Sequence, residues 1–259
     1  YFYLDELNKH GIKLYAEPIS SDAGTAIGAA YIAHYQITNS EKVLPFADSL
    51  YLGPSYGYDN KEIGHLADDY NATLEKVKME DVVKLMCEKN IVAMFQGRSE
   101  AGPRALGNRS LMYDPTDPNG KDHVNKVKRR EYFRPFAGTI LAEHAEEWFD
   151  MRGMKDSPHM MYAMDCQPGV EEKIPSIIHV DGTCRIQTVT REQNPLYYDY
   201  INEFYKQTGV PIIFNTSFNL GGEPLVETLD DAFRTLANSE IEYLYIAEHN
   251  ILAKVENVS

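Results

Sequence analysis

The sequence predicts a mixed α/β fold, on two observations. Short apolar runs typical of buried strands alternate with longer segments of helical periodicity, and turn signals such as Asp181-Gly182 break any strict order of strand, helix and parallel strand. The 259 residues, 43% hydrophobic and 25% charged, are enough to bury a substantial core. No run approaches the roughly 18 apolar residues that a membrane helix requires, so we expect no membrane partner.

The three cysteines, Cys87, Cys166 and Cys184, are an odd number and have no CxxC spacing. This argues against a disulfide framework and against a structural zinc site. We therefore expect idle thiols in a reducing compartment, and a cytoplasmic protein.

The N-terminal segment resembles the end of a domain. Residues 12–16 predict a strand and 23–33, rich in Gly and Ala, a helix that packs closely on a neighbour, but no parallel strand follows. Residues 39–75 are rich in Pro, Gly, Tyr and Asn without a sustained period, which predicts a linker.

Regular structure is expected from residue 80 onward. Helices are predicted at 80–86, 120–128, 143–149, 195–207 and 229–237. Strands are predicted at 91–95, 110–113, 136–141, 160–164, 177–180, 185–189, 210–214 and 243–255.

One basic stretch contrasts with the acidity of the chain. From Arg98 to Arg134 there are nine Lys or Arg and five acidic residues, a local net charge of +4 in a protein of net charge -14. Gly97, Gly102 and Gly107 lie five apart in it, among Arg98, Arg104 and Arg109. Glycines allow close backbone approach and arginine forks bind phosphate or carboxylate oxygens in pairs, so we expect an anion site. The alternative is a solvated loop neutralised by its own acids.

Further candidates lie downstream. Lys121 and Lys128 share a helical face, and Arg134 stands just before a strand, although a charged helix face is often only solvated. Arg185 follows the turn at Asp181. Asn215 and Ser217 follow an apolar strand, where α/β sheets bind ligands, and we interpret Ser217 as a hydrogen-bond donor.

These motifs carry a family resemblance. Residues 97–110 (GRSEAGPRALGNRS), 121–137 (KDHVNKVKRREYFRPFA), 179–189 (HVDGTCRIQTV) and 214–226 (FNTSFNLGGEPLV) resemble the C-terminal part of the NodU/CmcH/TobZ family of O-carbamoyltransferases. The resemblance implies that residues 61–259 form a YrdC-like domain, a twisted mixed sheet with flanking helices. Residues 1–60 would be the tail of an actin-like ATPase-fold domain plus a linker.

The resemblance also implies a reaction. The YrdC-like domain would form carbamoyl-adenylate from carbamoyl phosphate and ATP with Mg²⁺, for transfer to a hydroxyl of a small molecule, sugar or nucleoside. A homodimer is compatible with it. The residues that it implies as catalytic are Arg104, Lys128 and Arg134. Those implied in binding ATP or carbamoyl phosphate are Arg98, Arg109, Arg185, Asn215, Ser217, Gly102 and Gly107.

Asp22 resembles a metal-ligand aspartate of the family's transfer site, which also uses a His-x-x-x-His pair. The eight histidines of this sequence contain no such pair. The implied metal site, for Fe²⁺ or another divalent metal, is thus incomplete. We expect the chain to be the C-terminal portion of a longer protein, competent for the adenylation half-reaction only.

Two alternatives come from other functional classes. An RNA- or DNA-binding YrdC-like module would also present a basic surface, but its aromatic residues, Tyr113, Tyr132, Phe133 and Phe136, cluster at the edges of the basic stretch instead of forming a spaced stacking platform. The overall acidity disfavours nonspecific DNA binding as well. The other alternative is an inactive remnant retained for assembly.

Overall fold

A computed structural model of the protein describes residues 1–20, 22–40 and 49–255. Its strands are β1 Ala72–Lys76, β2 Val92–Phe95, β3 Arg109–Tyr113, β4 Ala137–Leu141, β5 Tyr162–Asp165, β6 Thr183–Val189, β7 Ile212–Ser217, β8 Tyr243–Ile246 and β9 Ile251–Val255. Its α-helices are α1 Leu4–Lys9, α2 Asp22–Thr38, α3 Asn60–Asp69, α4 Met79–Cys87, α5 Gly120–Val127, α6 Ala145–Trp148, α7 Pro195–Thr208 and α8 Leu229–Ala237.

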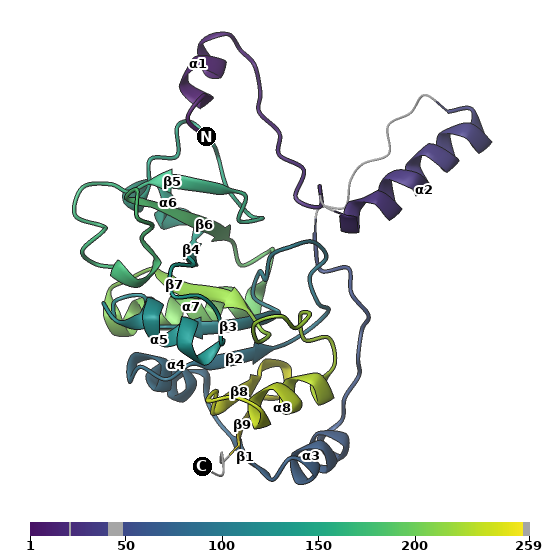
Figure 1. Cartoon of the computed structure of the whole chain (residues 1–259), viewed down its shortest axis with the longest axis vertical. Coiled ribbons are helices and arrows are strands. Elements are labelled where there is room, and N and C mark those ends of the chain that lie inside the picture. Colours follow the sequence, from purple (N-terminus) through teal and green to yellow (C-terminus); the bar gives the residue numbers. More distant parts are fainter. Residues whose placement is uncertain (21, 41–48, 256–259) are drawn as a thin grey trace.

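The nine strands form one sheet in the order β1-β9-β8-β2-β3-β7-β4-β6-β5 (Figure 1). Two neighbouring pairs, β2 with β8 and β4 with β6, are parallel, and the other six are antiparallel. The mixed α/β class predicted from the sequence is confirmed.

Helices bury the middle of this sheet. All residues of β2, β3 and β4 are buried. Helix α7 packs on β4, β7 and α4, and its Tyr197, Tyr200 and Phe204 are fully buried. Helix α8 packs on β8 and β9 through Phe233 and its apolar neighbours. The packed sheet is therefore a rigid base for the loops that leave β3 and β7.

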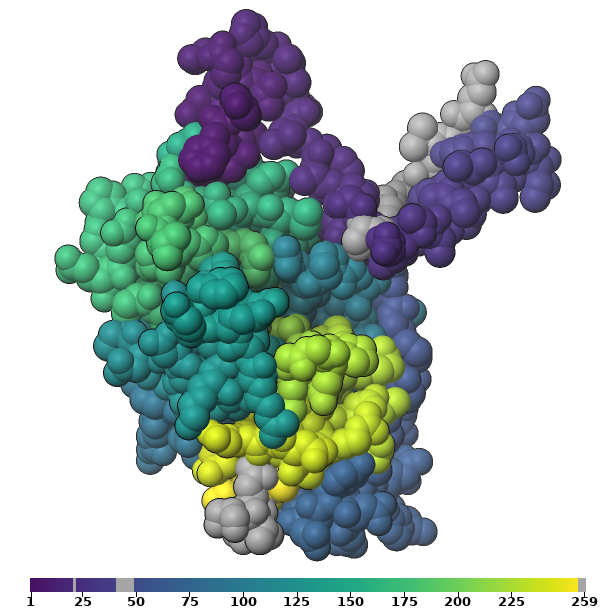
Figure 2. All heavy atoms as spheres, in the orientation of Figure 1, coloured from purple at the N-terminus to yellow at the C-terminus, as the bar shows by residue number. Residues whose placement is uncertain are grey.

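Helix α2 stands apart from the sheet (Figures 1 and 2), whereas the Tyr1 hydroxyl accepts a hydrogen bond from the amide of Asp165 in β5 at 3.2 Å. Helix α2 has no buried residue. The segments on either side of it are nevertheless anchored, because Ile19 and Leu50 are buried in a second, smaller apolar cluster. Its other buried members are Leu106, Ala137 and Met160. The cluster joins the N-terminal segments to the loop before β3; the predicted domain boundary at residue 60 stays a prediction.

Two predictions for the N-terminal part were wrong. Residues 12–16 do not form a strand; they are irregular and largely exposed. The expected linker at 39–75 contains α3 and the start of β1, although residues 41–48 lie outside the described part. Asp59 begins α3: its side chain accepts hydrogen bonds from the backbone amides of Lys61 and Glu62, both at 2.8 Å, and its own amide donates to the Glu62 carboxylate at 2.8 Å. The helix predicted at 23–33 is confirmed as the longer α2.

Two C-terminal strands were also predicted wrongly. Residues 177–180 form no strand, because Pro175 begins a 3-10 turn at Pro175–Ile177. The long strand at 243–255 is two strands, β8 and β9, which reverse at the turn Ala247–His249 and at Asn250, whose φ is 49°. The remaining predicted elements from residue 80 onward are confirmed with shifted ends.

Within the described ranges, no helix combines the length and the apolar character needed to cross a membrane.

Gly107 offers a test of this packing. Its φ is +114°, and a Cβ on it would lie 2.3 Å from Cδ1 of Tyr197. We expect Gly107→Ala to lower the free energy of unfolding by about 2–4 kcal/mol in urea denaturation, because both backbone strain and overpacking oppose the methyl group.

Gly209→Ala is the matched control. Gly209 ends α7 with a φ of +74°, and nothing lies within 4 Å of its Cβ position. We expect it to cost about 1 kcal/mol from strain alone. Equal costs for the two variants would contradict the packing role of Gly107.

Candidate functional site

Two loops form a cleft of about 610 Å³ at one end of β7. One loop, 128–134, follows α5, and the other, 217–222, follows β7. We call this space the basic cleft. It is lined by Lys128, Arg129, Arg130, Glu131, Arg134, Ser217, Asn219, Leu220, Gly221 and Gly222.

A buried amide shapes the first of these loops. Asn125, 1% exposed, donates from Nδ2 to the carbonyl oxygens of Tyr132 and Arg134, both at 3.1 Å. Its Oδ1 accepts a hydrogen bond from Arg130 Nε at 2.6 Å. Arg129, with a φ of +53°, turns the chain after α5. The loop is therefore held in a fixed curve around one side chain.

Lys128 joins the two loops. Its Nζ donates to the carbonyl oxygens of Ser217 and Asn219, the latter at 2.8 Å, and to Asn219 Oδ1 at 3.1 Å. The Gly221 amide donates in return to the Lys128 carbonyl at 2.7 Å, and a Cβ on Gly221 would lie 2.7 Å from the Arg129 carbonyl oxygen. Burial, and then the charge of Arg130, lower the pKa of Lys128 to about 7.

A smaller hollow of about 80 Å³ adjoins the basic cleft, because Arg130 and Ser217 line both. We call it the arginine hollow. Arg104, Arg185 and Asn215 also line it. Strand pairing positions these side chains, since β4 lies between β6, which carries Arg185, and β7, which carries Asn215.

The charges of the arginine hollow are not compensated. Burial and the neighbouring charge of Arg104 lower the pKa of Arg185 to about 10; burial and Arg134 lower that of Arg130 to about 10. Within the described residues, Arg104, Arg130 and Arg185 form no ion pair with a carboxylate. The buried donors Nε of Arg104 and Nε of Arg185 have no hydrogen-bond partner there, and neither has the buried acceptor Oδ1 of Asn215. Donors left unpaired beside like charges suit an anion.

Comparison with known proteins shows the family of this chain. The family described as Carbamoyltransferase C-terminus matches residues 83–253, which include the basic cleft and the arginine hollow. The chain belongs to this carbamoyltransferase family. The resemblance seen in the sequence motifs is therefore confirmed.

The relatives of this chain include nodulation proteins. It is 36% identical to nodulation protein NolO of Bradyrhizobium diazoefficiens, over 90% of this chain and 43% of NolO, and 36% identical to nodulation protein NolNO of Sinorhizobium fredii, over 92% and 36%. The chain thus spans less than half the length of these relatives. A solved structure of full-length HypF, in a phosphate- and nucleotide-bound form, matches with a TM-score of 0.48 and 18% identity, over 70% of this chain and 26% of HypF.

Arg109, predicted to bind phosphate, lies instead inside the carbamoyltransferase core. It is 0% exposed, its guanidinium donates to the carbonyl oxygens of Gln96, Gly97, Asn108 and Glu227, and it stacks 3.7 Å from the ring centre of Phe95. Its donors are used by the protein itself, so this placement does not fit a ligand role.

Arg98, Gly102 and Gly107, which were also predicted to bind a ligand, have structural roles in the loop before β3. Arg98 is exposed and donates to the carbonyl oxygens of Leu52 and Gly53. Gly102 and Gly107 have positive φ, and their Cβ positions meet Pro18 and Tyr197, not the cleft. The expected close approach of the backbone to an anion therefore does not fit these two glycines.

A buried acid shapes the loop that carries Arg104. Glu100, 7% exposed, accepts hydrogen bonds at Oε1 from the backbone amides of Leu106, Asn108 and Arg109, at 2.7, 2.8 and 3.4 Å. Burial raises the pKa of this carboxyl. Glu100 thereby closes the loop around Arg104 and fixes where it enters the arginine hollow.

The other predicted residues line the two adjoining spaces: Lys128 and Arg134 the basic cleft, Arg104, Arg185 and Asn215 the arginine hollow, and Ser217 both; their ligand roles stay predictions. Sequence reasoning missed Arg130 and Asn219, which lie inside the quoted motifs but are indistinguishable there from their charged or polar neighbours. Asp22 is exposed at the start of α2. In the described part of the chain, no group of three or more His, Cys, Asp or Glu is placed to hold a metal ion.

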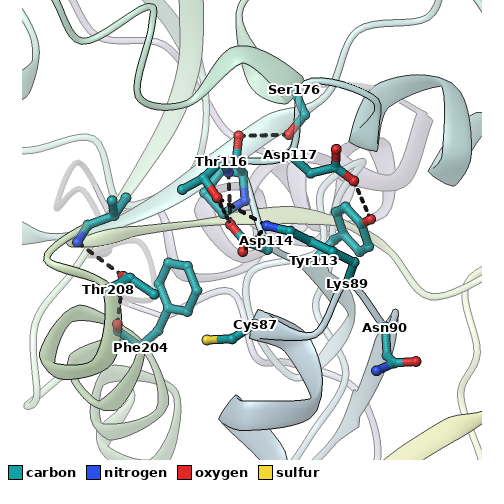
Figure 3. Close-up of polar contacts among 12 residues, drawn as sticks. Cys87, Lys89, Asn90, Tyr113, Asp114, Thr116, Asp117, Ser176, Phe204 and Thr208 are labelled. Carbon is teal, nitrogen blue, oxygen red and sulfur yellow. Dashed lines mark hydrogen bonds and ion pairs between the residues drawn. The ribbon is translucent and has the colours of Figure 1, made fainter.

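A second polar cluster lies beyond the other end of β3 (Figure 3). Lys89 points to Asp114 and forms an ion pair with it, and Asp114 Oδ1 accepts from the amide and hydroxyl of Thr116 at 2.8 and 2.7 Å. The Tyr113 hydroxyl donates to Asp117 at 2.6 Å. Because these groups satisfy one another, the cluster stabilises a turn and lacks the unpaired donors of the arginine hollow.

The contrast between Arg185 and Arg109 is testable by substitution. Without added anions, we expect Arg185→Gln to change the free energy of unfolding by less than about 0.5 kcal/mol or to raise it, because it relieves repulsion. Arg109→Gln should cost about 3 kcal/mol or more, because it leaves buried carbonyls unpaired.

Sulfate supplies the second readout in the same thermal or urea unfolding experiment. At one hundred times its dissociation constant it should stabilise the wild type by about 2.7 kcal/mol, and the Arg185→Gln variant much less. A large loss of stability in Arg185→Gln with an unchanged sulfate response would contradict an anion site.

The lowered pKa of Lys128 predicts that the protein takes up protons when it binds an anion. At pH 8 an amine with a pKa of about 7 is mostly neutral, and a bound anion favours its charged form. Calorimetric titration of sulfate in two buffers of different ionisation heat should give roughly 0.5–1 proton taken up at pH 8, and less as the pH falls below 7.

Lys128→Arg is the control for this measurement, since arginine stays charged throughout the pH range. We expect no uptake from this variant. Equal uptake in both proteins would show that another group titrates.

Proposed function

We propose that this carbamoyltransferase-family chain forms carbamoyl-adenylate from carbamoyl phosphate and ATP. The observation that carries the proposal is the arginine hollow, which combines buried, uncompensated charge with unpaired donors beside a larger basic cleft. A reaction that gathers several phosphate charges at one centre needs such a positive, preorganised environment.

The basic cleft is larger than the arginine hollow, as ATP is larger than carbamoyl phosphate. A cleft of about 610 Å³ lies within the usual range for sites that hold a molecule of nucleotide size. The hollow of about 80 Å³ admits only a small anion. We therefore assign the triphosphate to Arg134 in the basic cleft, where the buried amine of Lys128 orders the cleft wall through its own hydrogen bonds, and carbamoyl phosphate to Arg104 and Arg185 in the arginine hollow.

The overall reaction balances with one water molecule. Hydrolysis of the P–O bond of carbamoyl phosphate gives carbamate and inorganic phosphate. A carbamate oxygen then bonds to the α-phosphorus of ATP as the bond to the departing pyrophosphate breaks. Arg130 lines both spaces, so its guanidinium is placed to stabilise negative charge that develops between the substrates.

Magnesium would enter with ATP, since substrate phosphates and water supply most of its ligands. Glu131 lines the cleft and is the carboxylate that fits this task there, although it now pairs with Arg134, from Oε2 to Nε, at 2.6 Å. An exposed pair of this kind is worth little energy and can open. Bound magnesium would neutralise phosphate charge, while Arg134, released from Glu131, would contact the triphosphate.

We propose transfer of the carbamoyl group to an acceptor only for a longer protein that contains this chain, because the relatives are more than twice as long as the chain. There the carbamoyl group would pass to a hydroxyl of a sugar, nucleoside or other small molecule, with Asp22 among the ligands of a divalent metal. A cytoplasmic location and a homodimer remain expectations. The buried position of the arginines supports small anions over a nucleic acid, which needs a broad exposed face.

The half-reaction is measured by the exchange of labelled pyrophosphate into ATP. We expect exchange that depends on carbamoyl phosphate and Mg²⁺, and a loss of about 100-fold or more in Arg104→Gln, because a charge aimed at the reacting phosphates is removed.

Arg191→Gln is the matched control, since Arg191 is exposed and pairs with Asp199 on α7. It should exchange at nearly the wild-type rate. Absence of carbamoyl phosphate-dependent exchange in the wild type would refute the proposed half-reaction.

A further inference from the structure

Two exposed aromatic rings stand in the loop that forms one wall of the basic cleft. Tyr132 is 75% exposed and Phe133 64% exposed, and their ring centres lie 6.1 Å apart, edge to face. The residues on either side of them, Glu131 and Arg134, both line the cleft. Neither ring is among the side chains that line the cleft, so the pair stands next in sequence to two residues that do.

The exposure of these rings does not come from a loose loop. Asn125 holds the carbonyl oxygens of Tyr132 and Arg134, and the Arg134 amide donates to the Glu131 carbonyl at 3.2 Å. The fold thus immobilises the backbone on both sides of two large apolar groups that remain in water. Ordered, exposed aromatic pairs are typical of binding surfaces.

The composition of the basic cleft indicates what these rings bind. Within the described residues, Leu220 is the one large apolar side chain among those that line it, and Leu220 is only 3% exposed. Arg130, two residues before the rings, already lies 4.1 Å from the ring centre of Phe136. The cleft itself therefore offers charge for phosphates but little surface for a base.

We propose that Tyr132 and Phe133 form a stacking platform for the base of the nucleotide. This inference rests on the proposed function, since it assigns the base of the ATP whose phosphates occupy the basic cleft. Aromatic side chains stack on any base, because every base has a π-face. The platform should therefore strengthen nucleotide binding without strongly distinguishing ATP from GTP.

The experiment compares ATP with inorganic tripolyphosphate, which has the same chain of phosphates and no base. Dissociation constants for both are measured by calorimetry with Mg²⁺ at constant pH. In the double variant Tyr132→Ala/Phe133→Ala, we expect the constant for ATP to rise by about 5-fold to 150-fold, the range of one stacking contact, and that for tripolyphosphate to change less than about 2-fold.

Two further double variants control for folding and for general loss of aromatic surface. Tyr132→Phe/Phe133→Tyr keeps both rings and should bind ATP nearly as the wild type does. Phe2→Ala/Tyr3→Ala removes an exposed pair, 70% and 78% exposed, from the N-terminal segment and should change neither constant.

The outcomes separate this inference from the proposed function. If the alanine variant weakens both ligands equally, the rings only support the loop, and the platform is refuted. Unchanged ATP affinity also refutes it and leaves a protein partner as the occupant of the rings. If the wild type binds neither ligand, the proposed function fails and the platform fails with it.

Discussion

The proposed function depends on keeping Arg104, Arg130 and Arg185 close together without a neutralising carboxylate. Repulsion and desolvation both oppose this arrangement, so the packed sheet has to supply the energy that holds it. The cost is a reason to expect function: unpaired buried donors persist where a ligand completes them. The polar groups around Asp114 are instead satisfied by one another.

Hydrogen bonds within the protein position four charged groups of the site. Asn125 curves the loop of Arg130 and Arg134, Glu100 closes the loop of Arg104, and the carbonyls after β7 hold Lys128. Such buried hydrogen bonds fix geometry before a ligand arrives, which reduces the ordering required on binding. The same loops present Tyr132 and Phe133, so charge and aromatic surface come from one element.

The sequence located the site better than it assigned its members. The charge excess between Arg98 and Arg134 is a property of composition, and it predicted an anion site where the structure brings cations together. Arg104 and Arg109 look alike in the motif, but the strand that begins at Arg109 carries it into the core. Such burial is set by tertiary packing, which local pattern does not encode. Likewise, the sequence analysis did not predict α3, because Pro and Gly surround it; the capping residue Asp59 is the one local feature that indicates its start.

The central claim is that the arginine hollow holds carbamoyl phosphate beside the triphosphate of ATP. A crystal structure of the chain with carbamoyl phosphate and a non-hydrolysable ATP analogue tests it most directly. The account predicts phosphate oxygens within hydrogen-bond distance of Nε of both Arg104 and Arg185, and the triphosphate against Arg134. Both ligands bound elsewhere, with these Nε atoms still unpaired, would contradict it.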